Sequence, residues 1–310
     1  MSLSKSGVAI LGIFVADLAF RSGRMPAVGE TIIGSGFAMG PGGKGSNQAV
    51  AAARAGVHVR FISKIGSDSF GDIAMATWTH EGIETHVGRS KDQPTGAAFI
   101  YVNDKNGENA IIVVPGAAGT ISIADVEAVG DAIRGSAVFV TQLEQPTAAA
   151  QRGLEIARQA NVITIFNPAP AEPFADAIYS LTDFITPNES EAAALTGLPV
   201  ESVDDAKRAG DAFLKKGVGT ALITLGEKGA LLHTREQSVL VPAFNAGNVV
   251  ETAGAGDAFN GGFAAALARG MDPLSATRFG CAAAGISVTR HGTAPAMPTL
   301  AEIDSLLAGS

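Results

Sequence analysis

Residues 249–263 read VVETAGAGDAFNGGF, and the fold is inferred outward from this stretch. The pattern predicts a strand that enters a glycine turn and then a helix. Backbone N–H groups at the start of a helix hold negative charge, and glycines let an anion approach the main chain closely. We therefore expect the backbone of Gly254, Ala255 and Gly256 to form an anion hole for a phosphate group.

Asp257 follows this turn and allows two interpretations. It could merely cap the helix, as aspartate often does. It could instead accept the proton of a hydroxyl group while the neighbouring N–H groups stabilise charge on a transferring phosphoryl group. A dinucleotide-binding fingerprint fails, because Phe259 stands where a third glycine is required and a carboxylate in the loop would repel a pyrophosphate.

A second glycine loop, GPGGKGSNQ, spans residues 40–48 and precedes a predicted helix. It differs from a P-loop, because Gly45 follows Lys44 where serine or threonine is required and Ala38 occupies the first glycine position. Small residues would let a polar ligand lie against the backbone while Lys44 and Asn47 donate hydrogen bonds. An ordinary tight turn with a solvated lysine is the alternative.

Two further segments carry weaker signals. Asn188 and Glu191 have the spacing of a capping box, and they could also reach magnesium-bound phosphates through water. Residues 224–229, TLGEKG, form a strand-to-turn segment that suits the phosphates and ribose of a nucleotide or is a turn without function. Neither segment decides between these interpretations by itself.

Strands alternate with helices of about 10–15 residues along most of the chain, which predicts a parallel sheet with helices on both faces. A hairpin at 97–102 and 110–114 interrupts this order, and we expect it to pair with 29–39, which looks strand-like at 31–33, as a small separate sheet. Ligands collect at the carboxyl ends of parallel strands. The polar residues that follow apolar runs are Asp17, Glu144, Asn167, Asn188 and Thr224. The predicted core strands are 8–14, 60–65, 137–143, 162–166, 183–186 and 221–225, and the predicted helices include 45–54, 73–81 and 147–159.

The composition excludes several function classes. The net charge of −8 argues against binding nucleic acid or an anionic membrane, which needs a basic face. Cys281 is the one cysteine of the 310 residues, so thiols of one chain cannot build a disulfide or a zinc cage. Residues 1–6 lack an apolar signal core and no run of 18 apolar residues occurs, so we expect a cytoplasmic protein that crosses no membrane.

Together and in this order, these segments resemble the ribokinase family of carbohydrate kinases over about residues 8–307. The resemblance rests on GGKGSNQA at 42–49, NPAP at 167–170, TPNE at 186–189, TLG at 224–226 and AGDAFNG at 255–261. It implies an α/β fold with a three-layer α/β/α core, a mostly parallel central sheet and a small β-sheet lid. The core would comprise 6–14, 42–94 and 116–308, and the lid 15–41 and 95–115. Such a lid is often shared by two subunits, so the resemblance implies a homodimer.

The resemblance also implies an activity, the ATP-dependent transfer of the γ-phosphoryl group to a primary hydroxyl of a pentose such as ribose. Asp257 would be the general base, and Mg²⁺ would accompany ATP. The sugar would be bound by Asp17, Gly42, Gly43, Lys44, Asn47 and Glu144. ATP would be bound by Asn188, Glu191, Thr224, Gly226, Gly229 and Gly256.

Three positions depart from the family pattern. Val15 stands where an asparagine is usual, two residues before Asp17, so one hydrogen bond to the sugar is missing. Glu251 and Ala296 replace an aspartate and a serine at a monovalent-cation site, where K⁺ would be held by Glu251, Ala253, Ser287, Arg290 and Gly292. Deoxyribose, fructose or a nucleoside therefore remain alternative substrates, and a non-catalytic regulatory protein that binds sugar or nucleotide is the alternative from another class.

Overall fold

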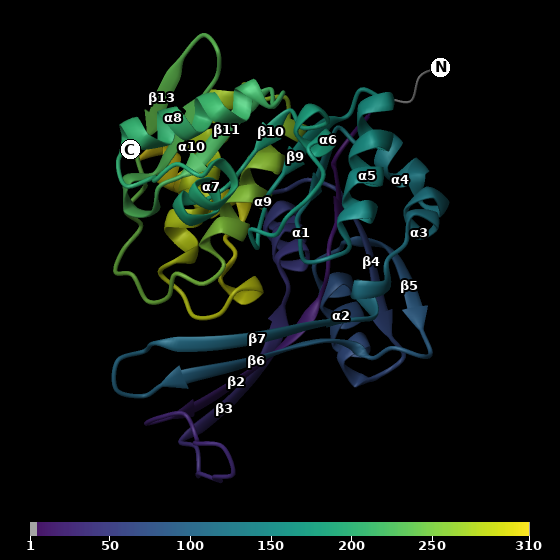
Figure 1. The fold of residues 1–310 in the computed structure, drawn as a ribbon, viewed down its shortest axis with the longest axis vertical. Coiled ribbons are helices and arrows are strands. Elements are labelled where there is room, and N and C mark those ends of the chain that lie inside the picture. The colour runs from purple at the N-terminus through teal and green to yellow at the C-terminus, as the bar shows by residue number, and fades with distance from the viewer. Residues whose placement is uncertain (1–4, 310) are drawn as a thin grey trace.

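A nine-stranded sheet runs through the computed structural model, which describes residues 5–309 (Figure 1). The neighbouring strands are parallel except at β11–β12 and β12–β13, which are antiparallel. In spatial order the strands are β13 (Ser238–Val241), β12 (Ala230–His233), β11 (Thr220–Thr224), β10 (Phe184–Ile185), β9 (Ile163–Phe166), β8 (Val138–Thr141), β1 (Val8–Leu11), β4 (Val59–Gly66) and β5 (Glu84–Ser90).

Two hydrophobic cores lie on opposite faces of this sheet. Successive side chains of a strand point to opposite faces, so Val8 and Ile10 of β1 join one core while Ala9 and Leu11 join the other. The first core is covered by α1 (Lys44–Arg54), α2 (Ser69–His80), α9 (Ala255–Ala268), α10 (Pro273–Ser287) and α11 (Leu300–Ala308). The second is covered by α3 (Ile123–Ala128), α4 (Gly130–Arg134), α5 (Thr147–Gln159), α6 (Ala177–Ser180), α7 (Glu189–Thr196) and α8 (Val203–Lys215). The predicted three-layer α/β/α core is confirmed.

A four-stranded sheet projects from one end of the core, and it forms the lower part of Figure 1. Its central pair, β2 and β6, is parallel, and β3 and β7 are antiparallel edge strands. This is the small second sheet that was predicted, and it is called the lid below. The division of the chain at 15–41 and 95–115 stays a prediction. The lid strands are β3 (Gly36–Gly42), β2 (Val15–Ser22), β6 (Thr95–Asn103) and β7 (Asn109–Gly116).

The predicted pairing within the lid is wrong in one respect. Residues 36–42 pair with β2 and not with the hairpin, because β2 lies between β3 and β6. Residues 31–33 are not a strand, since the β2–β3 ladder ends at Arg21 and Gly36 and leaves them without a partner strand. Ile33 is accordingly 93% exposed.

The strand predicted before the glycine turn at 254–256 is also absent from the described residues. Residues 247–253 form no ladder, and Val249 is 67% exposed. The end of α10 supplies the missing acceptor instead, because the backbone N–H groups of Val250 and Glu251 both donate to the carbonyl of Val288. The first strand ends at Leu11 rather than at residue 14.

Short 3₁₀ turns complete the described chain. The turns η1 (Ala117–Thr120), η2 (Gly226–Lys228) and η3 (Ala294–Ala296) connect larger elements. Over residues 5–309, no helix combines the length and the hydropathy needed to cross a membrane. Residues 1–6 were predicted to lack a signal core, and residues 1–4 of this segment lie outside the described residues.

Candidate active site

A small cavity of about 150 Å³ lies where the carboxyl ends of the central strands meet the start of α9. Residues that follow β9, β10 and β11 reach it because parallel strands end at the same edge of the sheet. Seven predicted site residues line it, together with four that were not assigned to the site. The lining consists of Lys44, Asn167, Ala169, Thr186, Asn188, Glu191, Thr224, Gly254, Gly256, Asp257 and Asn260.

Asp257 occupies the first turn of α9 and is 7% exposed. It does not cap the helix, so the capping interpretation is wrong. Its Oδ2 accepts a hydrogen bond from Nδ2 of Asn47 at 3.1 Å, and its Oδ1 accepts one from Nε2 of Gln48 at 3.1 Å. Burial raises the pKa of this carboxyl group, while the charge of Lys44 and the two amide donors lower it.

Gly254 and Gly256, two residues of the expected anion hole, line the cavity, and the N–H group of Ala255 between them is already hydrogen-bonded. Gly254 is in the left-handed region at φ 78°, and no side chain caps the helix that follows. A Cβ on Gly256 would meet nothing within 4 Å, so the space beside its main chain is open. The N–H of Ala255 donates to the carbonyl of Thr252, which an anion would have to displace.

The second glycine loop brings α1 against the first strands. Gly43 has φ 90°, and a Cβ there would lie 2.6 Å from the carbonyl oxygen of Ile13, so only glycine fits this close turn. The backbone N–H of Lys44 donates to Oε2 of Glu144 at 2.7 Å. The Oδ1 atom of Asn47 is buried and accepts no hydrogen bond within the described part of the chain, which fits a site for a sugar hydroxyl.

Lys44 is surrounded by carboxyl groups. Burial lowers the pKa of Lys44, but Asp257, Glu144 and Glu191 outweigh it and hold the pKa above its usual value. Burial raises the pKa of Glu144 to about 7, with Lys44 opposing the shift and Asp257 adding to it. Burial together with the charges of Asp257 and Glu251 raises the pKa of Asp17 to about 6. The cluster therefore favours a bound cation or protonated carboxyl groups.

Asn188 and Glu191 form the capping box that was predicted. The Asn188 side chain accepts from the N–H of Glu191, and the Glu191 carboxylate accepts from the N–H of Asn188 at 2.9 Å. Both residues also line the cavity, beside Thr224. The other two predicted nucleotide residues, Gly226 and Gly229, do not line it. A Cβ on Gly229 would lie 2.0 Å from the carbonyl oxygen of Val241, so close packing requires glycine at 229.

The predicted cation-site residues form two separate hydrogen-bonded pairs, Glu251 with Gly292 and Ser287 with Arg290. Glu251 accepts from the N–H of Gly292 at 3.0 Å, and the His291 ring lies 3.6 Å from its carboxylate. The carbonyl of Ser287 accepts from the N–H of Arg290, whose side chain pairs with Glu302. Ala253 precedes Gly254 in the turn. Whether these carbonyl groups bind K⁺ stays a prediction.

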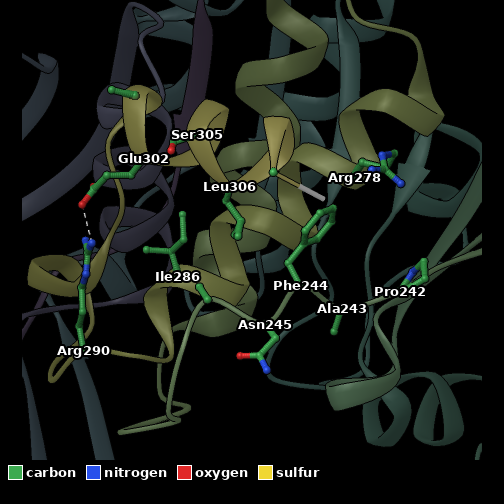
Figure 2. Close-up of a pocket in the computed structure, with 13 residues that line it drawn as sticks. Pro242, Ala243, Phe244, Asn245, Arg278, Ile286, Arg290, Glu302, Ser305 and Leu306 are labelled. Carbon is green, nitrogen blue, oxygen red and sulfur yellow. Dashed lines mark hydrogen bonds and ion pairs between the residues drawn. The ribbon is translucent and has the colours of Figure 1, made fainter.

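A larger cavity lies elsewhere, between residues 242–246, α10 and α11, and has a volume of about 850 Å³ (Figure 2). The Arg278 guanidinium lies 5.4 Å from the centre of the Phe244 ring there, and the ion pair of Arg290 with Glu302 borders it. Arg290 is the one predicted site residue in its lining. The chemistry is therefore argued from the smaller cavity, which contains Asp257.

Sequence reasoning gave no role to several residues that the fold brings to the site. Asn260 is 1% exposed, accepts from Oγ1 of Thr186 at 2.6 Å and donates to the carbonyl of Gly256 at 2.8 Å. Asn167 was noted as a polar residue after a strand and as part of the NPAP motif at 167–170, without a role in the site. One sequence signal could have indicated them: amide and hydroxyl side chains stand just after two neighbouring strands, Asn167 after β9 and Thr186 after β10.

The raised pKa of Asp17 predicts a pH-dependent cost to stability. The pKa of Asp17 is about 6 in the folded chain, whereas the ordinary value is 3.8. The folded state therefore binds this proton more tightly than the unfolded state, and the stability that the proton contributes is lost as the pH rises from about 4 to 6. We expect Asp17→Asn to raise the free energy of unfolding of the ligand-free protein at pH 8 by about 1–2 kcal/mol. Urea unfolding at pH 8 and pH 3.5 measures it.

The gain should vanish at pH 3.5, where the carboxyl group is protonated in both states. Asp92→Asn, at an exposed position, is the control and should change little at either pH. An Asp17→Asn protein that is no more stable than the wild type at pH 8 would contradict the proposed burial of charge.

Comparison with known proteins places this chain in a family. A family model described as pfkB family carbohydrate kinase matches residues 5–300. The chain is 40% identical to a ribokinase of Haemophilus influenzae over 296 residues, which cover 95% of this chain and 96% of that protein. It is 36% identical to a deoxyribokinase of Salmonella typhi over 302 residues, which cover 97% and 98%.

The fold agrees with this result. An Arabidopsis thaliana ribokinase, solved in complex with ribose and ATP, is similar to this structure with a TM-score of 0.92 and 28% sequence identity, covering 99% of this chain and 100% of that one. The resemblance inferred from the motifs is confirmed. The chain therefore belongs to the pfkB family of carbohydrate kinases.

Proposed function

We propose that this carbohydrate kinase transfers the γ-phosphoryl group of ATP to the primary hydroxyl of a pentose, with ribose as the first candidate. The observation that carries the proposal is the buried carboxylate of Asp257 beside the open main chain of Gly256. The ribokinases of H. influenzae and A. thaliana support ribose, and the deoxyribokinase of S. typhi supports 2-deoxyribose as the alternative.

Asp257 would act as the general base. The carboxylate accepts two amide hydrogen bonds, from Asn47 and Gln48, and still has lone pairs to take the proton of the sugar hydroxyl. The adjacent main chain of Gly254 and Gly256 would stabilise charge on the phosphoryl group as it moves. Asp17, Glu144 and the free Oδ1 of Asn47 would hold the other hydroxyl groups of the sugar.

ATP with Mg²⁺ fits the donors that are present. The cavity has room for a phosphoryl group but not for a whole nucleotide, so the nucleoside would extend outward past Thr224 and the 226–229 turn. A triphosphate beside Asp257 and Glu191 needs more positive charge than Lys44 supplies, and Mg²⁺ would neutralise it. Within residues 5–309 no group of three or more His, Cys, Asp or Glu residues could hold a metal ion. Mg²⁺ would be held through phosphates and waters, near Asn188 and Glu191.

The activity is tested by ADP release with Mg-ATP across D-ribose, 2-deoxy-D-ribose, D-fructose, adenosine and other pentoses. We expect a pentose to give the highest kcat/KM, and we expect K⁺ in place of Na⁺ to raise turnover through the Glu251 site. Asp257→Asn should keep sugar and ATP binding, measured by calorimetry, but lower kcat by about 100-fold or more because the change keeps the shape and removes the base.

An Asp257→Asn protein with wild-type kcat would overturn the assigned role of Asp257. Wild-type protein that binds ATP but phosphorylates none of these compounds would favour the regulatory alternative instead.

Val15 should set the choice between ribose and 2-deoxyribose. Val15 and Asp17 lie on one face of β2 because they are two residues apart, and Val15 is 2% exposed with an apolar side chain. We expect Val15→Asn to raise the ratio of kcat/KM for ribose over 2-deoxyribose by about tenfold, since it restores a hydrogen-bonding group. Val15→Ala is the control, and it should change both sugars alike. If Val15→Asn leaves the ratio of kcat/KM for the two sugars unchanged, residue 15 does not contribute to sugar selectivity.

We further propose that two copies associate through their lids. β7 is an edge strand whose apolar residues Ile111, Ile112, Val113 and Val114 are 43–63% exposed, which is costly for an isolated sheet. A second copy would cover them. We expect Ile112→Lys to convert a dimer into a monomer in sedimentation velocity, whereas Leu240→Lys, on the far strand β13, should leave the dimer intact. A wild-type monomer at high micromolar concentration would contradict the proposal.

A further inference from the structure

A chain of buried amide side chains lies beneath the catalytic carboxylate. Nε2 of Gln142 donates to Oε1 of Gln48 at 2.6 Å, and Nε2 of Gln48 donates to Oδ1 of Asp257 at 3.1 Å. Nε2 of Gln48 also donates to Oδ1 of Asn167 at 3.1 Å. Gln48 and Gln142 are 0% exposed. Gln142 itself follows β8, does not line the small cavity and carries no assigned role.

The contacts permit only one orientation of the Gln48 amide. Its two N–H bonds match its two acceptors, Asp257 and Asn167, and Asn167 is itself oriented because its Nδ2 donates to the carbonyl of Thr186 at 2.8 Å. Reversing the Gln48 amide would place its oxygen against the Asp257 carboxylate and its NH₂ group against that of Gln142. Gln142 supplies the donor that the Gln48 oxygen needs in this orientation.

Gln142 is not explained by packing alone. Its Oε1 is buried and has no hydrogen-bond partner among residues 5–309, which costs stability. Room for it exists only because residues 12 and 45 are glycine: a Cβ would lie 2.5 Å from this oxygen if placed on Gly12, and 3.0 Å from it if placed on Gly45. An apolar side chain would fill a fully buried site at lower cost. The amide is therefore better accounted for by its donation to Gln48.

We propose that Gln142 is a positioning residue for phosphoryl transfer, which holds the Gln48 amide so that it donates to Asp257. This inference rests on the proposed role of Asp257 as the base. With Gln48 on Oδ1 and Asn47 on Oδ2, the plane of the carboxylate is held and its ionised form is favoured at the pH where a base is needed.

The charged groups that face Asp257 come from four elements, and substitution of Gln142 changes none of them. They are Lys44 of α1, Asp17 of β2, Glu144 after β8 and Glu191 of α7. The hydrogen bond from Gln48 lowers the pKa of Asp257. Its loss should raise that pKa, so the ionised base would be lost at a higher pH as the solution is acidified.

The test is the pH profile of kcat with saturating sugar and Mg-ATP for wild type and Gln142→Met, whose side chain has similar length and no amide. We expect the acidic limb of the kcat profile of Gln142→Met to shift to higher pH by about 0.5–1 unit, so that kcat at a pH well down that limb falls about three- to tenfold. KM for sugar and ATP should stay within about twofold. Gln48→Met, which removes the donor itself, should shift the limb at least as far.

Gln145→Met is the matched control. Gln145 is 3% exposed and also has an unpartnered Oε1, but its Nε2 donates to Oγ1 of Thr141 and to the carbonyl of Gln142, away from Asp257. The acidic limb of the kcat profile of Gln145→Met should coincide with that of the wild type. Circular dichroism checks folding, and Gln142→Asn, which withdraws the amide by one methylene, is the second variant and should shift the limb in the same direction.

An active wild type whose acidic limb is unchanged in folded Gln142→Met or Gln142→Asn would overturn this inference and leave the proposed function standing. An equal shift in Gln145→Met would overturn it as well, because loss of any buried amide would then suffice. A wild type that phosphorylates no sugar would overturn the proposed function, and the inference with it.

Discussion

Helices α1 and α9 approach one another so closely at Gly261 that no side chain fits between them. A Cβ on Gly261 would lie 2.4 Å from the Cβ of Ala51 and 2.6 Å from the carbonyl oxygen of Gln48. This contact carries Asn47 and Gln48 to within hydrogen-bond distance of Asp257, which is more than 200 residues away along the chain. The position of the base, and with it the chemistry of this kinase, depends on two helices that pack through glycine and alanine.

The same close packing creates an electrostatic problem in the ligand-free protein. Glu144, Glu191 and Asp257 share one partly buried cation, Lys44, and Asp17 faces the charges of Asp257 and Glu251. Burial raises the pKa of four of these carboxyl groups, those of Asp17, Glu144, Glu191 and Asp257. Sugar hydroxyl groups would supply donors to the carboxylates, and Mg²⁺ would supply charge for the phosphates. The protein with this site empty is therefore less stable than the protein with ligands bound, because the clustered carboxyl groups serve binding at the expense of the stability of the ligand-free fold.

The sequence was most informative where one local rule sufficed. The alternation of strands and helices predicted the parallel sheet, and α5 has the same bounds, 147–159, as the predicted helix. The Asn188 capping box was also readable from four residues. The strand pairing within the lid was not readable, because β2 has ladder partners on both sides and one of them, β6, lies about 80 residues further along the chain. The predicted strand at 249–250 failed because α10, which comes later in the chain, accepts its N–H groups.

The sequence by itself determined the family, the α/β class and the identity of the candidate base, since these depend on residue types and spacings within short motifs. Only the tertiary structure decided that Asp257 is held by Asn47 and Gln48 rather than capping α9, and that Gln142 lies behind them. The physical reason is that burial and hydrogen-bond partners are set by contacts between distant segments. Gln142 lies outside the motifs that carried the resemblance, and only the tertiary structure brings its amide to Gln48, which donates to the base.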